Sequence, residues 1–283
     1  MNRKILHILI SYKTSSQAEK FLLDCIRQKA SSEVEFILVN NSARSPEDLT
    51  FQHLENAQVR VLSCPDNPGY FPASERALKM VGDIRAFHWV IVSNADLKWD
   101  QQDAYSELLK TSVMPGQGVF GPRIHSELFR RETNPLSWHR PTPKKIEFLS
   151  LVYSSYILAF SYHFLSSLKN YFFSPEDQEL SKPMDQRVIY SLHGAFLIFH
   201  RNFFVAGGSL HHPVALYGEE YNIAEQCLAL RIRPLLLPQL RLSHQEAGSQ
   251  NFIWQRLGLS GAKFRQKQQS LVFLRQLYGL SPK

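Results

Sequence analysis

Three positions far apart in the chain carry side chains suited to metal or proton chemistry. Asp96 closes the segment Asn94-Ala95-Asp96, directly after an apolar run. Glu219 and Glu220 stand at the start of an expected helix, where the positive end of the helix dipole favours carboxylates. His244 follows another mostly apolar run. Carboxylate oxygens and imidazoles are ligands for divalent cations, and a positioned carboxylate also serves as a general base.

A fold must bring these positions together, and the chain alternates strand and helix patterns. Short apolar and β-branched runs predict strands, which are Ile5–Ile10, Val34–Val39, Val59–Leu62 and Trp89–Ser93. Helical patterns accompany them, at Gln17–Gln28, Pro72–Val81 and Glu219–Leu230. This alternation predicts an α/β fold with a three-layer core, in which helices cover a mainly parallel sheet. Ligands of such sheets bind outside the carboxyl ends of the strands.

The residues that follow the predicted strands are all polar or turn-forming. They are Ser11-Tyr12-Lys13, Asn40-Asn41-Ser42, Asp66-Asn67-Pro68-Gly69-Tyr70 and Asn94-Ala95-Asp96. Each one alone is typical of an ordinary turn. Four in succession, ending in a carboxylate, favour a nucleotide site at this edge of the sheet.

Charge and cysteine content limit the partners and the compartment. The 32 Lys and Arg residues against 25 Asp and Glu residues give a formal charge of +7, which favours anionic partners. The chain has no aromatic RNA-binding signature, zinc-ligand spacing or concentrated basic tail, so we expect no nucleic-acid partner. Three widely spaced cysteines are typical of a reducing, cytoplasmic compartment. The run Ile5–Ile10 is too short for a signal peptide and predicts a buried strand.

Taken in order, the motifs resemble those of the family 2 glycosyltransferases of the GT-A fold, in particular their bacterial rhamnosyltransferase-like branch. The similarity covers about residues 4–124 and 188–250. The matching motifs are Ser11-Tyr12-Lys13, Val39-Asn40-Asn41-Ser42, Asn67-Pro68-Gly69-Tyr70, Asn94-Ala95-Asp96, Gly194-Ala195-Phe196 with Phe199, Arg201 and Gly207-Gly208, Tyr217-Gly218-Glu219-Glu220, and His244 with Gly248-Ser249. No single motif is specific, and the signal lies in their common order and spacing.

The resemblance implies a Rossmann-like GT-A core, the fold of nucleotide-diphospho-sugar transferases. It implies an inverting, metal-dependent transfer of a hexosyl or deoxyhexosyl group from a nucleotide-sugar donor to an acceptor hydroxyl. Asp96 and His244 would bind Mn²⁺ or Mg²⁺ on the donor diphosphate, and Glu220 would be the catalytic base. The donor-binding residues implied in the same way are Ser11, Tyr12, Asn40, Asn67, Gly69, Asn94, Gly194 and Ala195.

Several positions depart from the family pattern. Asn40 and Glu220 each replace an Asp, Asn222 replaces another acid, and Glu75 stands where a polar amide is more typical. Two alternatives therefore stay open. One is a catalytically degenerate glycosyltransferase that acts as a binding subunit. The other is a nucleotidyltransferase, although the Gly-rich phosphate loop expected of that class is absent from Ser11–Ser16.

The predicted organisation has four parts. Residues 1–124 form the nucleotide-sugar half of the core and 188–250 form the acceptor and catalytic half. Between them, 125–187 is an inserted basic and apolar segment that we expect to face a membrane. A C-terminal amphipathic helical extension occupies 251–283.

The insert contains a long run without charge. Phe148–Leu168 has no Asp, Glu, Lys or Arg and matches the roughly 20 residues of a spanning helix. A span at this point would put the two halves of the site on opposite sides of the membrane, so an interfacial position is expected instead. The flanking basic residues are Arg140, Lys144, Lys145 and Lys169. A helical layer packed on the protein's own core, or at a dimer interface, is the alternative.

The segment Lys263–Tyr278 predicts a second amphipathic helix, on which Phe264, Leu271, Leu274 and Tyr278 share one face. We expect it to lie on the same surface. The predicted location is peripheral, on the anionic inner face of the cytoplasmic membrane. By analogy with the family, the acceptor would be a lipid-linked saccharide in bacterial surface polysaccharide biosynthesis, such as O-antigen or capsule.

Overall fold

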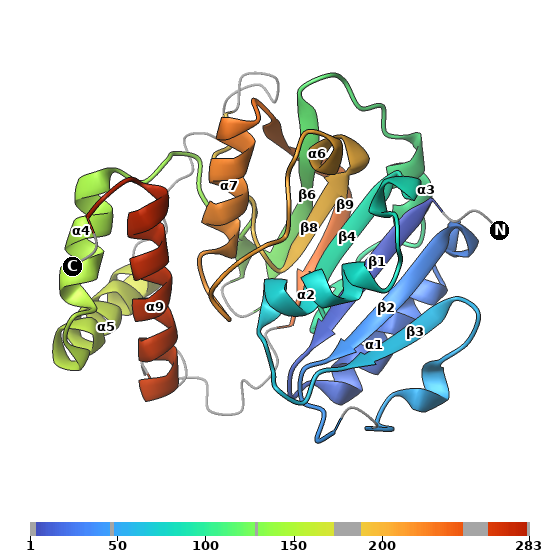
Figure 1. Ribbon diagram of the computed structural model, residues 1–283, viewed down its shortest axis with the longest axis horizontal. Helices are drawn as coiled ribbons and strands as arrows, with labels where there is room; N and C mark the ends of the chain where they lie inside the picture. Colours follow the sequence, from blue (N-terminus) through green and yellow to red (C-terminus); the bar gives the residue numbers. More distant parts are fainter. Residues whose placement is uncertain (1–3, 46–47, 128–129, 173–187, 246–259, 282–283) are drawn as a thin grey trace.

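One large sheet forms the centre of the protein, which the computed structural model describes at residues 4–45, 48–127, 130–172, 188–245 and 260–281. Within these residues the sheet has nine strands (Figure 1). The strands are β1 (Ile5–Ser11), β2 (Val34–Asn40), β3 (Val59–Ser63), β4 (Trp89–Asn94), β5 (Leu97–Trp99), β6 (Gln117–Ser126), β7 (Arg131–Glu132), β8 (Phe196–His200) and β9 (Arg233–His244).

The strand order is β3-β2-β1-β4-β8-β6-β9-β5, and β7 pairs with β6. Strands β1, β2, β3, β4, β6 and β9 run in one direction, and β5, β7 and β8 run in the other. The prediction of a mainly parallel sheet is therefore confirmed. The four strands predicted in the first half of the chain are all present.

Helices cover both faces of this sheet. The helices of the described residues are α1 (Ser15–Ile26), α2 (Tyr70–Lys79), α3 (Ala104–Lys110), α4 (Pro143–Val152), α5 (Tyr156–Phe172), α6 (Arg201–Val205), α7 (Glu219–Ala229) and α9 (Gly261–Leu277), with single 3₁₀ turns η1 (Ser31–Glu33), η2 (Gln52–Leu54) and η3 (Ile84–Ala86). Helices α1 and α3 pack on one face, and α2, α6 and α7 pack on the other (Figure 1). The expected three-layer core is confirmed.

Strand β1 shows why this sheet is buried on both sides. Ile5 and Leu9 face the α1 side, whereas Leu6 and Ile8 face the α2 side. His7 is the polar exception, and it is fully buried. Burial lowers the pKa of His7 to about 3, so the ring is neutral. Its two nitrogens contact the Tyr105 hydroxyl at 2.7 Å and the Ser93 hydroxyl at 2.9 Å, which satisfies both.

Some elements differ from the expectation, for local reasons. The sequence does not predict β5, which is three residues long, or β6, whose two glycines and proline hide the strand pattern. Helix α2 begins at Tyr70 rather than Pro72, because Gly69 has a φ of 109° and reverses the chain just before it.

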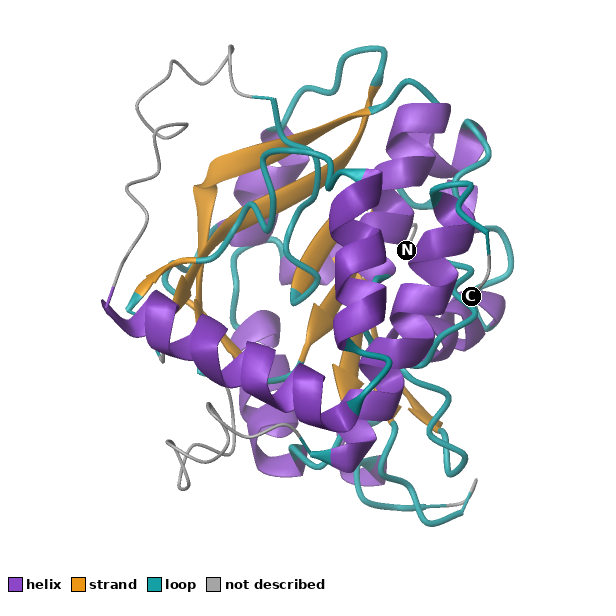
Figure 2. Cartoon of the chain, turned by 90° about the vertical axis from the view of Figure 1, so that its left-hand side faces the viewer, coloured by secondary structure: helices purple, strands orange, loops and turns teal. Residues whose placement is uncertain are grey.

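A further helical layer, made of α4, α5 and α9, stands beside α7 (Figures 1 and 2). Its core includes Ile146 and Val152 from α4, with Leu271 and Leu274 from α9. Arg140 ties this layer to α7 by paired hydrogen bonds of 2.8 Å to the Glu225 carboxylate. The described helices of the two segments predicted as separate additions, α4 and α5 of 125–187 and α9 of 251–283, therefore pack together.

This packing corrects the expectation for α9. The apolar face predicted from Phe264, Leu271, Leu274 and Tyr278 exists, but it lies against α4 and α5. It is not available to a membrane surface. Among the described residues, no single helix is long and apolar enough to cross a membrane. Pro143–Val152 and Tyr156–Ser166 reach that length and composition only as a pair, which is bent by 118°.

Candidate functional site

The carboxyl ends of β1, β2 and β4 meet at one edge of the sheet. Ser11 lies opposite Asn40 in the β1–β2 pairing, and Ile10 lies opposite Asn94 in the β1–β4 pairing. Asp96 follows β4 by two residues. The parallel register therefore brings the polar segments after these strands together, as expected for an α/β sheet.

An open cleft of about 380 Å³ lies at this edge. Five of the predicted site residues line it, namely Tyr12, Asn67, Gly69, Asn94 and Asp96. The remaining lining residues are Ile10, Thr14, Asn41, Tyr70, Ala95, Leu216, Tyr217, Ala262, Lys263 and Gln266. The last three belong to the first turns of α9, a segment that the sequence does not connect with the site.

Asp96, which follows β4, and His244, the last residue of β9, lie next to each other beside the cleft. The Asp96 Oδ1 atom lies 3.2 Å from His244 Nε2, although 148 positions separate the residues in the chain. Antiparallel pairing of β5 with β9 sets this approach, because it aligns Leu97 with His244. The Gln245 N–H also donates to the Asp96 carbonyl oxygen at 3.0 Å. Of the predicted motif, Gly248-Ser249 lies outside the described residues.

His193, which had no predicted role, stands next to this pair. Its ring lies edge-on to the His244 ring, with 6.1 Å between the centroids. The Ala195 N–H donates to His193 Nδ1 at 3.1 Å, which leaves the ring proton on Nε2. Burial, and then the nearby charge of His244, lower the pKa of His193 to about 4. The ring is therefore neutral near pH 7.

Gly69 allows two parts of the cleft wall to approach closely. A Cβ atom at Gly69 would lie 2.0 Å from the Ala215 carbonyl oxygen. The following amide, of Tyr70, donates to that same oxygen at 2.9 Å. The Tyr70 hydroxyl then donates to the Gly194 carbonyl oxygen at 2.7 Å. Gly194 itself does not line the cleft, but it is hydrogen-bonded to Tyr70, which does.

The two adjacent asparagines after β2 have different surroundings. Asn40 is buried and its Oδ1 accepts from the Ser42 N–H at 3.0 Å, so its side chain shapes the turn. Asn41 lines the cleft, and its Nδ2 donates to the Gly69 carbonyl oxygen at 2.9 Å. The Asn41 Oδ1 atom is buried without a hydrogen-bond partner in the described part of the chain. Ser11, also predicted, is buried beneath the cleft.

The acidic pair begins α7. Tyr217 and Gly218 both have positive φ, 71° and 88°, and this reversal delivers Glu219 and Glu220 into the first turn. Burial raises the pKa of Glu220, while main-chain amides of Glu220 and Gly194 oppose the shift. Burial and then the charge of Glu220 raise the pKa of Glu219 well above its usual range. The carboxyl groups therefore hold protons to higher pH than exposed ones would.

Glu220 lies behind the cleft wall and does not line the cleft itself. Its carboxylate is packed against Gly194, where an added Cβ would come within 2.6 Å of Oε1. It borders a small space of about 10 Å³, room for about one water molecule, together with Tyr190 and Ser191. The charges of Glu219, Glu220 and Asp96 all add to the effect of burial in raising the pKa of Tyr70. Tyr70 therefore stands near all three carboxylates.

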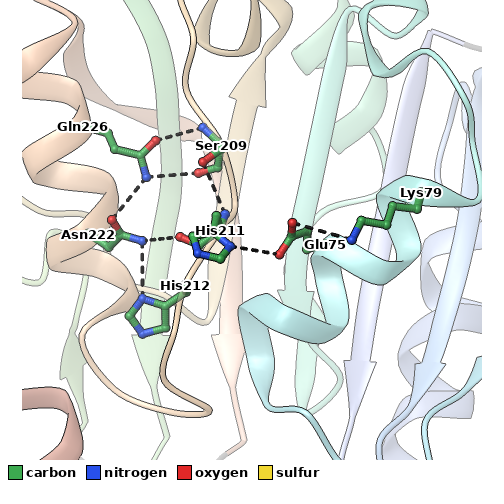
Figure 3. Close-up of polar contacts among 7 residues, drawn as sticks. All are labelled: Glu75, Lys79, Ser209, His211, His212, Asn222 and Gln226. Atoms are coloured by element: carbon green, nitrogen blue, oxygen red, sulfur yellow. Dashed lines mark hydrogen bonds and ion pairs between the residues drawn. The ribbon is translucent and has the colours of Figure 1, made fainter. Parts of the chain in front are cut away.

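A polar network anchors the loop before α7 (Figure 3). The Asn222 Nδ2 donates to the His211 carbonyl oxygen at 2.7 Å and contacts His212 Nδ1 at 3.3 Å. With Nδ1 as acceptor, the His212 Nε2–H is directed to the Tyr217 carbonyl oxygen, 3.2 Å away. Gln226 binds the main chain of Ser209 at both its N–H and its carbonyl oxygen. Asn222, a departure from the family pattern, thus has a structural use.

Glu75, another such departure, lies at the edge of this network. Its carboxylate is 3.5 Å from His211 Nδ1 and 3.8 Å from Lys79 Nζ (Figure 3). These groups are partly or largely exposed, so each ion pair contributes little to stability. Glu75 therefore connects α2 to the loop at 209–212 without entering the cleft.

Comparison with solved structures shows the same type of fold. No protein-family model matches the chain, and no curated protein sequence matches it significantly. The structure of GalNAc-T7 with UDP, GalNAc and Mn²⁺ is similar with a TM-score of 0.55, at 11% identity over 86% of this chain. The chain spans 44% of that structure.

The second similar structure is the mannosyltransferase PcManGT from Pyrobaculum calidifontis, in complex with GDP-Man and Mn²⁺. Its TM-score is 0.53, at 13% identity over 96% of this chain and 70% of that one. At such low identity the similarity establishes the fold. The expectation of a GT-A fold is confirmed.

Replacing Gly69 with alanine tests the close approach of the cleft wall. Gly69→Ala would force a methyl group into the Ala215 main chain and should lower the free energy of unfolding by about 1–3 kcal/mol beyond the backbone cost. Gly207→Ala is the matched control, because Gly207 has a φ of 99° with open space around it. Denaturant unfolding should therefore show a clearly larger loss for Gly69→Ala. Equal losses would mean that only the left-handed backbone matters at Gly69.

Proposed function

We propose that the chain is a metal-dependent glycosyltransferase, which transfers a sugar from a nucleotide-sugar donor to an acceptor hydroxyl. The observation that carries this proposal is the meeting of Asp96 and His244, 3.2 Å apart, beside the cleft at the carboxyl edge of the sheet. The GT-A fold supports it, since GalNAc-T7 and PcManGT, which share that fold, were determined with Mn²⁺ and with UDP or GDP-Man.

The residues at this position fit a divalent cation by their chemistry. A carboxylate oxygen and an imidazole nitrogen both suit Mn²⁺, and the oxygen also suits Mg²⁺. Within the described residues, no group of three or more His, Cys, Asp or Glu side chains could hold a metal ion. Asp96 and His244 would thus supply two ligands, and donor phosphate oxygens and water would supply the others. The ion would offset the negative charge of the leaving diphosphate.

Glu220 is our proposed general base. In an inverting displacement, the acceptor oxygen bonds to the anomeric carbon as the bond from that carbon to the diphosphate breaks. The hydroxyl proton then passes to a carboxylate. Burial raises the pKa of Glu220, which makes the ionised group a stronger base than an exposed glutamate. Because Glu220 lies behind the wall formed by Tyr70 and Gly194, acceptor binding would have to open this contact.

The finer assignment rests on the order of the sequence motifs. In this assignment, the chain is a family 2 enzyme of the rhamnosyltransferase-like branch. Its acceptor is a lipid-linked saccharide in bacterial surface polysaccharide biosynthesis. Tyr12 and Asn67 line the cleft and are suited to contact the donor. The degenerate alternative predicts donor binding without hydrolysis or transfer, so activity assays with the purified protein separate the two.

Substitution of Asp96 tests the metal site. Asp96→Asn keeps the side-chain shape but removes the charge, and should weaken Mn²⁺-dependent binding of UDP or GDP at least about tenfold. Asp83→Asn is the control, because Asp83 is exposed and pairs only locally with Arg85. Calorimetry with and without Mn²⁺ measures both. Unchanged affinity of Asp96→Asn in Mn²⁺ would refute the assignment, whereas His244→Ala should have a smaller effect.

Substitution of Glu220 tests the base. Glu220→Gln should lower turnover by about 10²–10⁴-fold while nucleotide affinity stays near the wild-type value, since the base serves the acceptor. The neighbouring change Glu219→Gln should be milder. Initial rates of transfer or donor hydrolysis provide the measurement. Near wild-type rates for Glu220→Gln would place the base elsewhere.

The second part of the proposal is that the protein associates with a membrane through α4 and α5. Among the residues whose burial the structure describes, these helices leave eight large apolar side chains exposed, which are Phe148, Leu151, Tyr156, Ile157, Leu158, Phe160, Phe164 and Leu165. Eight exposed apolar residues within two consecutive helices exceed the isolated apolar residues of an ordinary surface. Lys144 and Lys145 are exposed at the start of α4 and complement an anionic bilayer. We therefore propose an anionic lipid surface as the occupant of this patch.

Vesicle binding tests this patch directly. Leu151 and Ile157 are 66% and 76% exposed, so Leu151→Gln with Ile157→Gln should leave the fold intact and reduce sedimentation with phosphatidylglycerol vesicles several-fold. Val205→Gln is the matched control, because Val205 is also 66% exposed but lies on α6. High salt should release the wild type. Equal binding by the double variant would contradict the proposal, and a dimer disrupted by it would favour an interface between copies.

A further inference from the structure

The first turns of α9 form part of the cleft wall. Ala262, Lys263 and Gln266 line the cleft together with Asn94 and Asp96, from a helix that begins more than 150 positions later in the chain. Figure 1 shows α9 between α4 and α7. Helix α9, which packs on α4, thus also reaches the cleft at the carboxyl ends of β1 and β4.

Lys263 gives this wall its charge. Among the described residues that line the cleft, Lys263 is the one cation and Asp96 is the one carboxylate. Within the described part of the chain, no carboxylate lies within ion-pair distance of the Lys263 ammonium group. After burial, the charge of Lys263 is the second cause that lowers the pKa of Lys267. Among the described residues, the positive charge of Lys263 therefore has no ion-pair partner.

Several contacts hold this turn of α9 in place. The Ser260 Oγ accepts from the Lys263 N–H at 3.2 Å and so caps the helix. Lys267 lies over the rings of Tyr217 and Tyr153, at 5.5 and 5.7 Å from their centroids. Gly218 packs so closely on α9 that an added Cβ would lie 2.7 Å from the Ser270 Oγ atom. Lys263 thus belongs to a turn that is packed against Tyr153, Tyr217 and Gly218.

We propose that Lys263 binds the diphosphate of the nucleotide-sugar donor and stabilises it as the leaving group. This rests on the proposed function. When the bond between the anomeric carbon and the diphosphate breaks, both electrons stay on the phosphate oxygen, and the nucleoside diphosphate departs as an anion. The ammonium group stabilises that charge without giving up its proton. Together with a divalent cation on Asp96, it balances the charge of the diphosphate from two elements of the fold.

A comparison of two charge-matched variants tests Lys263. Lys263→Ala and Arg265→Ala each remove one positive charge from the same part of α9, but Arg265 is exposed and does not line the cleft. Binding of UDP and GDP, and of UMP and GMP, is measured by calorimetry with Mn²⁺. We expect Lys263→Ala to weaken nucleoside diphosphate binding about tenfold or more, with a smaller effect on the monophosphates. Arg265→Ala should change neither by more than about twofold.

The outcomes separate this inference from the proposed function. If the wild type binds a nucleoside diphosphate and Lys263→Ala binds it equally well, the role of Lys263 is refuted and the glycosyltransferase proposal stands. If Arg265→Ala loses as much affinity as Lys263→Ala, only the general charge of α9 matters, which also refutes it. If the wild type binds no nucleoside diphosphate, both proposals fall. Recovery of affinity in Lys263→Arg would support a cationic contact, and matching circular dichroism spectra would confirm an intact fold.

Discussion

The antiparallel pairing of β5 with β9 is the contact on which the candidate site depends. It sets Leu97 opposite His244 and so carries an imidazole to the carboxylate that ends the first half of the sheet. Strand β9 is long enough to pair with β6 as well, and β6 joins β8, which in turn pairs with β4. The distance between Asp96 and His244 is therefore fixed by a continuous hydrogen-bonded sheet rather than by flexible loops.

Tyr70 connects this edge to the acidic turn at the start of α7. Burial and the surrounding carboxylates raise its pKa well above the usual range, so the hydroxyl keeps its proton and donates to Gly194. The close packing at Gly69 and at Gly194 leaves no room for side chains there. Glycines that the sequence connects with donor binding thus act first by letting main chain and carboxylate approach. Whatever enters the cleft meets a wall whose shape these contacts determine.

Local patterns predicted the first half of the fold, because a parallel strand buried on both faces is a continuous apolar run. The order of the motifs predicts that Asp96 and His244 share one site, and the structure places them 3.2 Å apart. The sequence could not show that Asn40 turns inward while Asn41 lines the cleft, since adjacent asparagines look alike. It also could not place Lys263 in the cleft, because that depends on how α9 packs against α4 and α7. Amphipathic spacing identifies an apolar face but not its partner.

The central claim is that Asp96 and His244 share a divalent cation with a nucleoside diphosphate. Crystals grown with Mn²⁺ and UDP or GDP, measured for anomalous scattering of manganese, test it most directly. A peak at roughly 2.0–2.2 Å from both an Asp96 oxygen and a His244 nitrogen, with phosphate oxygens completing the coordination, is the expected result. A nucleotide in the cleft with no manganese at these two residues, or manganese bound elsewhere, would contradict the claim.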